Sequence, residues 1–119
     1  MARVAALVPD LLFGSRVQAV LAEGGHEVDL ITSEIEAWDQ VGGIDVLLVD
    51  LVTDAFDGVM LVDTLRSGGE MHGVRVLGVY SHVDADTRRR AEEAGFDLVV
   101  PRSRMVREGA ALVSGLAGG

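Results

Sequence analysis

Five short apolar runs, each followed by a segment with helical spacing of its apolar residues, constrain the fold of this chain more than any other feature. The runs occupy residues 3–8, 28–32, 44–49, 74–80 and 98–100. They are rich in Val, Leu, Ile and Ala and are short, which is typical of strands buried in a parallel sheet. Strands that alternate with helices through short links predict a doubly wound α/β fold, with helices on both faces of the sheet.

The segments between these runs carry helix signals. Ser33 and Glu36 form a capping box, Asp84 or Asp86 can cap a later helix, and Ser103 is the expected cap of the last one. Two helices show an inward stripe, made of Phe13, Val17, Val20 and Leu21 in the first and of Val106, Leu112, Val113 and Leu116 in the last. Glycine pairs at 24–25, 42–43 and 68–69 are expected to end helices.

Composition limits the size and the partners of the domain. The 119 residues are 49% hydrophobic, and no repeat or linker divides them, so residues 1–119 are expected to form a single domain. The net charge of −9 should repel phosphate backbones and anionic lipid, which argues against nucleic-acid and membrane partners. The one basic run, Arg88 to Arg90, is expected to be a solvated helix surface paired with nearby acids.

Several residue types are absent, and their absence excludes classes of chemistry. The chain has no cysteine, which removes disulfides and thiolate sites. All ten basic residues are arginine, so there is no Walker-A lysine and no Schiff-base lysine. With no leader and no apolar run long enough to span a bilayer, the expected location is the cytoplasm.

Polar residues follow the expected strands at their carboxyl ends. They are Asp10, Asp50 with Asp54, Ser81 and Arg102. In doubly wound sheets ligands bind at this edge, where two carboxylates can share a divalent cation and a hydroxyl and a guanidinium can contact a phosphoryl group. The alternative is that these side chains only cap helices and form turns.

The segment from Asp45 to Gly58 resembles the phosphoacceptor segment of response-regulator receiver domains. In that family an acceptor aspartate ends the third strand and an Asp-Gly pair follows seven residues later, as Asp50 and Asp57-Gly58 do here. Ala94-Gly95-Phe96-Asp97 is similar to the family's Ala-Gly-Ala-Asp turn. The resemblance covers essentially the whole chain and implies a chemotaxis-type, flavodoxin-like sheet of five parallel strands in the order 2-1-3-4-5.

Three positions depart from the family pattern. Receivers carry an acidic pair after the first strand, whereas Val8-Pro9-Asp10 offers one acid. The family's lysine after the fifth strand falls at Arg102, and its Met-Pro after the acceptor falls at Thr53-Asp54. Because metal affinity follows the number of charged ligands, Mg²⁺ binding by Asp10 and Asp50 should be weak unless Asp54 replaces the missing acid.

The resemblance therefore implies an atypical receiver, or pseudo-receiver, that acts by binding a protein partner or by forming a homodimer. The alternative is a phosphorylatable stand-alone receiver with Asp50 as acceptor, Asp10 and Asp50 as Mg²⁺ ligands, and Ser81 and Arg102 as phosphate contacts. A third hypothesis is a flavodoxin-like ligand-binding protein. We do not expect an enzyme: Ser81 and His82 are adjacent on extended chain, where side chains point to opposite sides, so they make a poor hydrolytic dyad.

Three further side chains lie outside the expected site. His26 and His72 are predicted to lie at the surface, because each sits in a loop or at the edge of a strand. Trp38, the one tryptophan, is predicted to pack against a neighbouring element, whereas an exposed tryptophan at this position would indicate a contact surface.

Overall fold

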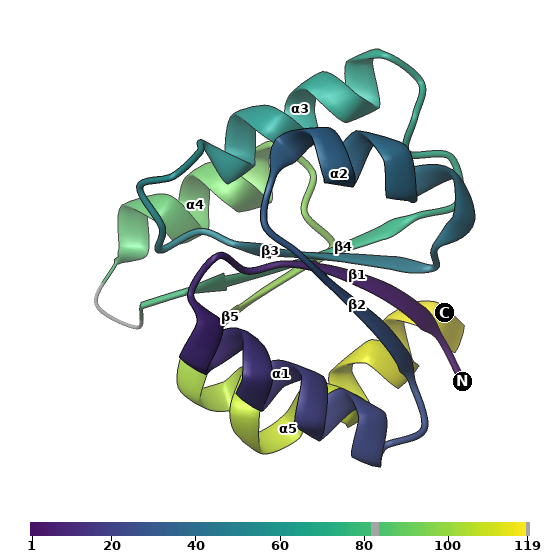
Figure 1. Cartoon of the computed structure of the whole chain (residues 1–119). Coiled ribbons are helices and arrows are strands. Elements are labelled where there is room, and N and C mark those ends of the chain that lie inside the picture. The colour runs from purple at the N-terminus through teal and green to yellow at the C-terminus, as the bar shows by residue number, and fades with distance from the viewer. Residues whose placement is uncertain (82–83, 119) are drawn as a thin grey trace.

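The computed structural model describes residues 1–81 and 84–118, and its centre is a parallel sheet between two layers of helices (Figure 1). The strands are β1 (Arg3–Leu7), β2 (Glu27–Ile31), β3 (Val46–Asp50), β4 (Arg75–Tyr80) and β5 (Leu98–Pro101), in the order β2-β1-β3-β4-β5. The helices are α1 (Leu11–Glu23), α2 (Glu34–Gln40), α3 (Gly58–Ser67), α4 (Ala85–Glu93) and α5 (Arg102–Gly118), with a short 3₁₀ turn, η1 (Val41–Gly43), after α2. The predicted doubly wound fold and the strand order are confirmed.

Strand β3 lies at the centre of the sheet and is buried on both faces. Leu47 and Val49 belong to the core cluster under α2, α3 and α4, whereas Val46 and Leu48 belong to the cluster under α1 and α5. Burial on both faces explains why this run is apolar throughout rather than alternating. The strand β2 lies at one edge of the sheet, and its Asp29 is exposed.

The register of the strands brings their carboxyl ends to one edge of the sheet. Leu7 pairs with Ile31 on one side and with Val49 on the other. Asp50 pairs with Val79, and the next pair in β4 and β5 is Tyr80 with Pro101. The chain segments that follow β1, β3, β4 and β5 therefore all leave the sheet at the same edge.

Side-chain caps begin four of the helices. Asp10, Ser33, Asp57 and Asp84 each accept a hydrogen bond from the backbone N–H three residues further on. The prediction that Ser103 caps the last helix is wrong. Strand β5 runs to Pro101 and α5 begins at the next residue, so Ser103 already lies inside the first turn.

The buried face of α5 confirms the predicted stripe in part, since Val113 is buried as predicted. Met105, Gly109 and Val113 are buried, whereas the predicted Val106, Leu112 and Leu116 flank that line and are half-buried. Gly109 belongs to the stripe because a Cβ there would lie 2.8 Å from Cε of Met105. Glycine carries no apolar signal, so apolar spacing alone could not locate the stripe. No helix within the described part of the chain is long and apolar enough to span a membrane.

Of the two histidines predicted to be at the surface, His72 is exposed and His26 is not. The side chain of His26 is buried, and its Nδ1 accepts the Ala2 N–H at 3.0 Å. Its Nε2 lies 3.1 Å from the carbonyl oxygen of Ala110 and 3.1 Å from Oγ of Ser114. The imidazole thus joins the start of β1, the loop after α1 and the middle of α5, three segments that are distant in sequence. Trp38, predicted to pack, lies on α2 with 39% of its surface exposed and one ring edge near Gly68.

We expect His26→Ala to lower the free energy of unfolding by about 1–3 kcal/mol, because the buried Ala2 N–H loses its acceptor. His72→Ala is the matched control and should change the free energy of unfolding by less than about 0.5 kcal/mol, since His72 is exposed. Urea denaturation of both variants measures the difference. Equal effects of the two substitutions would contradict the structural role of His26.

Candidate functional site

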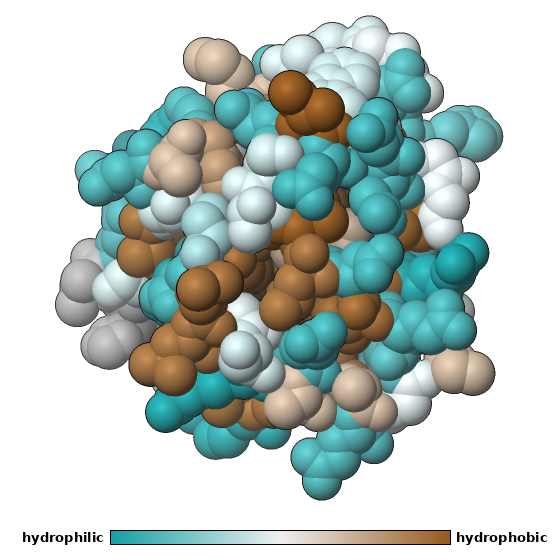
Figure 2. All heavy atoms as spheres, in the orientation of Figure 1, coloured by the Kyte–Doolittle hydropathy of each residue, from teal (hydrophilic) through white to brown (hydrophobic). Residues whose placement is uncertain are grey.

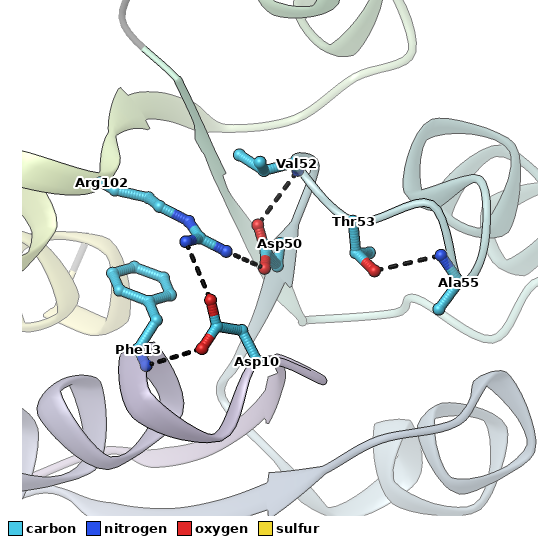
Figure 3. Close-up of polar contacts among 7 residues, drawn as sticks. All are labelled: Asp10, Phe13, Asp50, Val52, Thr53, Ala55 and Arg102. Atoms are coloured by element: carbon cyan, nitrogen blue, oxygen red, sulfur yellow. Dashed lines mark hydrogen bonds and ion pairs between the residues drawn. The ribbon is translucent and has the colours of Figure 1, made fainter.

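Asp10, Asp50 and Arg102 meet at the carboxyl edge of the sheet (Figure 3). Asp10 lies at the start of α1, Asp50 is the last residue of β3, and Arg102 is the first residue of α5. The guanidinium lies between the two carboxylates: Nη2 donates to Oδ2 of Asp50 at 2.6 Å and Nη1 donates to Oδ2 of Asp10 at 3.2 Å. We call these three side chains the ion triad.

Asp50 is fully buried, with no exposed surface. Its Oδ1 accepts the backbone N–H of Val52 at 3.0 Å, while its Oδ2 accepts from Arg102. A carboxylate taken out of water costs several kcal/mol unless a cation and hydrogen bonds compensate for the lost solvent. Arg102 is the cation that compensates Asp50.

The two carboxylate oxygens of Asp10 make different contacts. Its Oδ1 caps α1 by accepting the Phe13 N–H at 3.1 Å, which leaves Oδ2 for Arg102. The Phe13 N–H and, to a smaller extent, the Arg102 guanidinium hold the pKa of Asp10 below its ordinary value. Asp10 therefore stays ionised through the neutral range and adds its charge to the site.

Arg102 is held in place from three sides. Besides the two carboxylates, the ring of Phe13 lies under the guanidinium, with Cζ 4.2 Å from the ring centroid. The Nε atom is buried and has no hydrogen-bond partner among the described residues. The side chain retains 29% exposure on its outer side. The sequence identified Phe13 only as a core residue, and nothing in its spacing indicated that it would support Arg102.

The arrangement does not fit a Mg²⁺ ion. The carboxylate oxygens that face each other across the site are both bonded to Arg102, and a guanidinium and a divalent cation cannot share that position. Within residues 1–81 and 84–118, no group of three acidic or histidine side chains is arranged to hold a metal. Asp54, the proposed replacement acid, lies on the exposed β3–α3 loop and lines a different hollow, together with Asp57 and Arg90.

The remaining site residue predicted from the sequence, Ser81, lies at the same edge but outside the triad. It follows β4 directly, and its carbonyl oxygen accepts the N–H of Asp84. Among the hydrogen bonds of the described residues, none joins the Ser81 hydroxyl to Asp50 or Arg102. Tyr80, the last residue of β4, is buried in the core under α2, α3 and α4. His82 lies outside the described residues.

Comparison with solved structures identifies the architecture. A putative response regulator from Chloroflexus aurantiacus superposes with a TM-score of 0.89 at 20% identity, covering 99% of this chain and 98% of that one. A response-regulator receiver domain from Francisella gives 0.85 at 17% identity, with the same coverage of each chain. The receiver domain of a sensor histidine kinase from Pseudomonas aeruginosa, solved with a magnesium ion coordinated in its active site cleft, gives 0.85 at 16% identity over 99% and 98% of the two chains.

This chain has the receiver fold. No protein-family model matches the sequence, and no curated protein matches it either. The likeness is thus one of three-dimensional structure over nearly the full length of the chain. In this chain Asp50 is the last residue of the third strand, as the sequence resemblance implied. Arg102 is the first residue of the last helix.

We expect Arg102→Met to lower the free energy of unfolding by about 2–3 kcal/mol, because it leaves the buried Asp50 carboxylate without a cation. The double variant Arg102→Met with Asp50→Asn removes both charges and should be more stable than Arg102→Met alone. A double-mutant cycle by urea denaturation measures this coupling, which should exceed about 1 kcal/mol. If the two effects simply add, the ion pair between Arg102 and Asp50 does not contribute to folding.

Proposed function

We propose that this chain is an atypical receiver-like signalling domain that acts by binding another protein and catalyses no reaction of its own. One observation carries the proposal: Nη2 of Arg102 lies 2.6 Å from Oδ2 of the buried Asp50. The position that a soluble cation would need is filled by a side chain of the same chain. The guanidinium of Arg102 belongs to the chain and is always available to neutralise Asp50. The occupancy of a metal site, in contrast, depends on the concentration of the metal ion.

The fold supports a signalling role, since each of the three superposed structures is a receiver domain or a response regulator. The site argues against ordinary phosphorylation. Transfer of a phosphoryl group relies on a divalent cation to neutralise the developing charge, and the ion triad leaves no ligand set for one. A domain without that reaction passes its signal through a surface that contacts a protein partner or a second copy of itself.

The acidic character of the chain supports a protein partner rather than a nucleic acid. The net charge is −9, and the run Arg88 to Arg90 forms no basic patch. Its three guanidinium groups pair with Glu92, Asp86 and Asp57 respectively. The prediction that this run is a solvated, ion-paired helix surface is confirmed.

The position of Asp50 favours one alternative function. Asp50 ends the central strand at the ligand-binding edge, and Asp10 lies within the same triad, so a phosphorylatable receiver would use these two carboxylates. In that alternative, Arg102 would leave both carboxylates, Mg²⁺ would enter, and Arg102 would then contact the phosphoryl oxygens. The alternative thus requires the ion triad to open, which is what the next experiment measures.

We expect Mg²⁺ with beryllofluoride, a phosphoryl mimic, to cause no saturable change in the amide resonances of residues 50–53 at concentrations up to about 10 mM. The reason is that Arg102 holds both carboxylates. The variant Arg102→Lys keeps the positive charge but lacks the two Nη groups that bridge Asp10 and Asp50. Because lysine cannot hold both carboxylates in the same way, this variant should show a measurable response to Mg²⁺. A saturable response of the unmodified protein that Asp50→Asn abolishes would overturn the proposal in favour of a phosphorylatable receiver.

A further inference from the structure

A surface hollow of about 490 Å³ lies beside the ion triad, between the first turns of α1 and α5. Its walls come from α1 and the residue that caps it, and from the first turns of α5; they comprise Asp10, Leu12, Phe13, Arg16, Arg102, Ser103 and Val106. The volume lies within the range of small-molecule sites, which extends from about 300 to about 1,000 Å³. Arg102 lines the hollow, and 29% of its side-chain surface is exposed.

The walls of the hollow combine an apolar part with positive charge. Leu12, Phe13 and Val106 provide the apolar part, and Arg16 and Arg102 provide two guanidinium groups. Asp10 is the one acid in the lining, and each of its oxygens already accepts a hydrogen bond, from Phe13 N–H and from Arg102. Arg102 is already paired with Asp10 and Asp50, so Arg16 is the positive charge of the hollow that no carboxylate of the described residues neutralises, on a chain whose net charge is −9.

Arg16 differs from every other arginine of the described chain. All ten arginines are described, and nine of them have a carboxylate oxygen within 4 Å; these are arginines 3, 66, 75, 88, 89, 90, 102, 104 and 107. Arg16 has no such partner among the described residues. In a protein with nearly twice as many acidic as basic residues, a guanidinium without a carboxylate is available for an external anion.

Two further features of the hollow favour a ligand that carries both an apolar group and a negative charge. Leu12 is 72% exposed and Leu11 beside it is 78% exposed, although both begin a helix that packs on the core. Figure 2 shows apolar surface gathered over the region where α1 begins. On the other wall, no side chain of the described residues caps the first turn of α5, which includes Ser103. Its free backbone N–H groups add to the positive potential of the two arginines.

We propose that this hollow binds a small organic anion: a carboxylate or phosphate monoester attached to an apolar, ring-sized group. The apolar group lies on Leu12, Phe13 and Val106, and the anionic group lies between Arg16 and the outer side of Arg102. Bidentate pairing with Arg16 suits both anions, because the guanidinium fork matches two oxygens of either. Such an anion competes with Asp10 and Asp50 for the same guanidinium, so its binding is coupled to the ion triad.

The test is a titration of the ¹⁵N-labelled protein with four probes, followed by amide resonances. Benzoate and phenyl phosphate carry both an anion and a ring, benzamide has the ring without the charge, and inorganic phosphate has the charge without the ring. We expect saturable shifts at residues 11–17 and 102–106 with benzoate or phenyl phosphate, and affinities at least about tenfold weaker for benzamide and inorganic phosphate.

Two matched variants separate a specific site from general charge attraction. Arg16→Gln should weaken binding of the anionic probes about tenfold or more without altering the ion triad, to which Arg16 does not belong. Arg107→Gln removes the same charge from an exposed position of α5 outside the hollow and should leave the affinity unchanged. The proposal is overturned if no probe causes saturable shifts up to about 10 mM, if benzamide binds as well as benzoate, or if the two variants weaken binding equally.

Discussion

A carboxylate with no exposed surface, placed at the end of the central strand, needs a permanent counter-charge, and in this chain Arg102 supplies it. Without that cation, the buried carboxylate of Asp50 would carry an uncompensated charge that the interior cannot solvate. The backbone N–H of Val52 satisfies one oxygen of Asp50, and Arg102 satisfies the other. Three features of the fold hold this contact in place. Arg102 is the first residue of α5, Asp10 caps α1 and bonds to Arg102, and the ring of Phe13 packs against the guanidinium.

The parallel sheet makes the contact possible. Because β1, β3 and β5 end at the same edge, residues separated by 92 and 52 positions in sequence come within hydrogen-bond distance of one another. A receiver domain of a sensor histidine kinase from Pseudomonas aeruginosa was solved with a magnesium ion in its active site cleft. In this chain a side chain occupies the place between the carboxylates.

The sequence predicted the fold and the location of the site because both follow from local pattern and a topological rule. Alternating apolar runs indicate parallel strands, and parallel strands deliver Asp10, Asp50 and Arg102 to one edge. It could not predict that Arg102 would bridge both acids, because that depends on the stacking of its guanidinium on Phe13 and on the length of the side chain. His26 was missed for a related reason: its partners, Ala2 and Ala110, are distant in sequence, and no spacing rule links them. The stripe of α5 was predicted only in part: Val113 is buried as predicted, but Gly109 is buried without being apolar.

The guanidinium nitrogens of Arg102 report most directly on the central contact. In ¹⁵N-resolved NMR spectra, free arginines rotate about the Cζ–Nε bond and give averaged Nη signals. An arginine bound by two carboxylates gives separate Nη1 and Nη2 signals. We predict one such resolved pair for the unmodified protein, insensitive to added salt and lost in Asp50→Asn. Averaged Nη signals for every arginine, or a resolved pair that persists unchanged in Asp50→Asn, would contradict the claim that Arg102 is the fixed cation of Asp50.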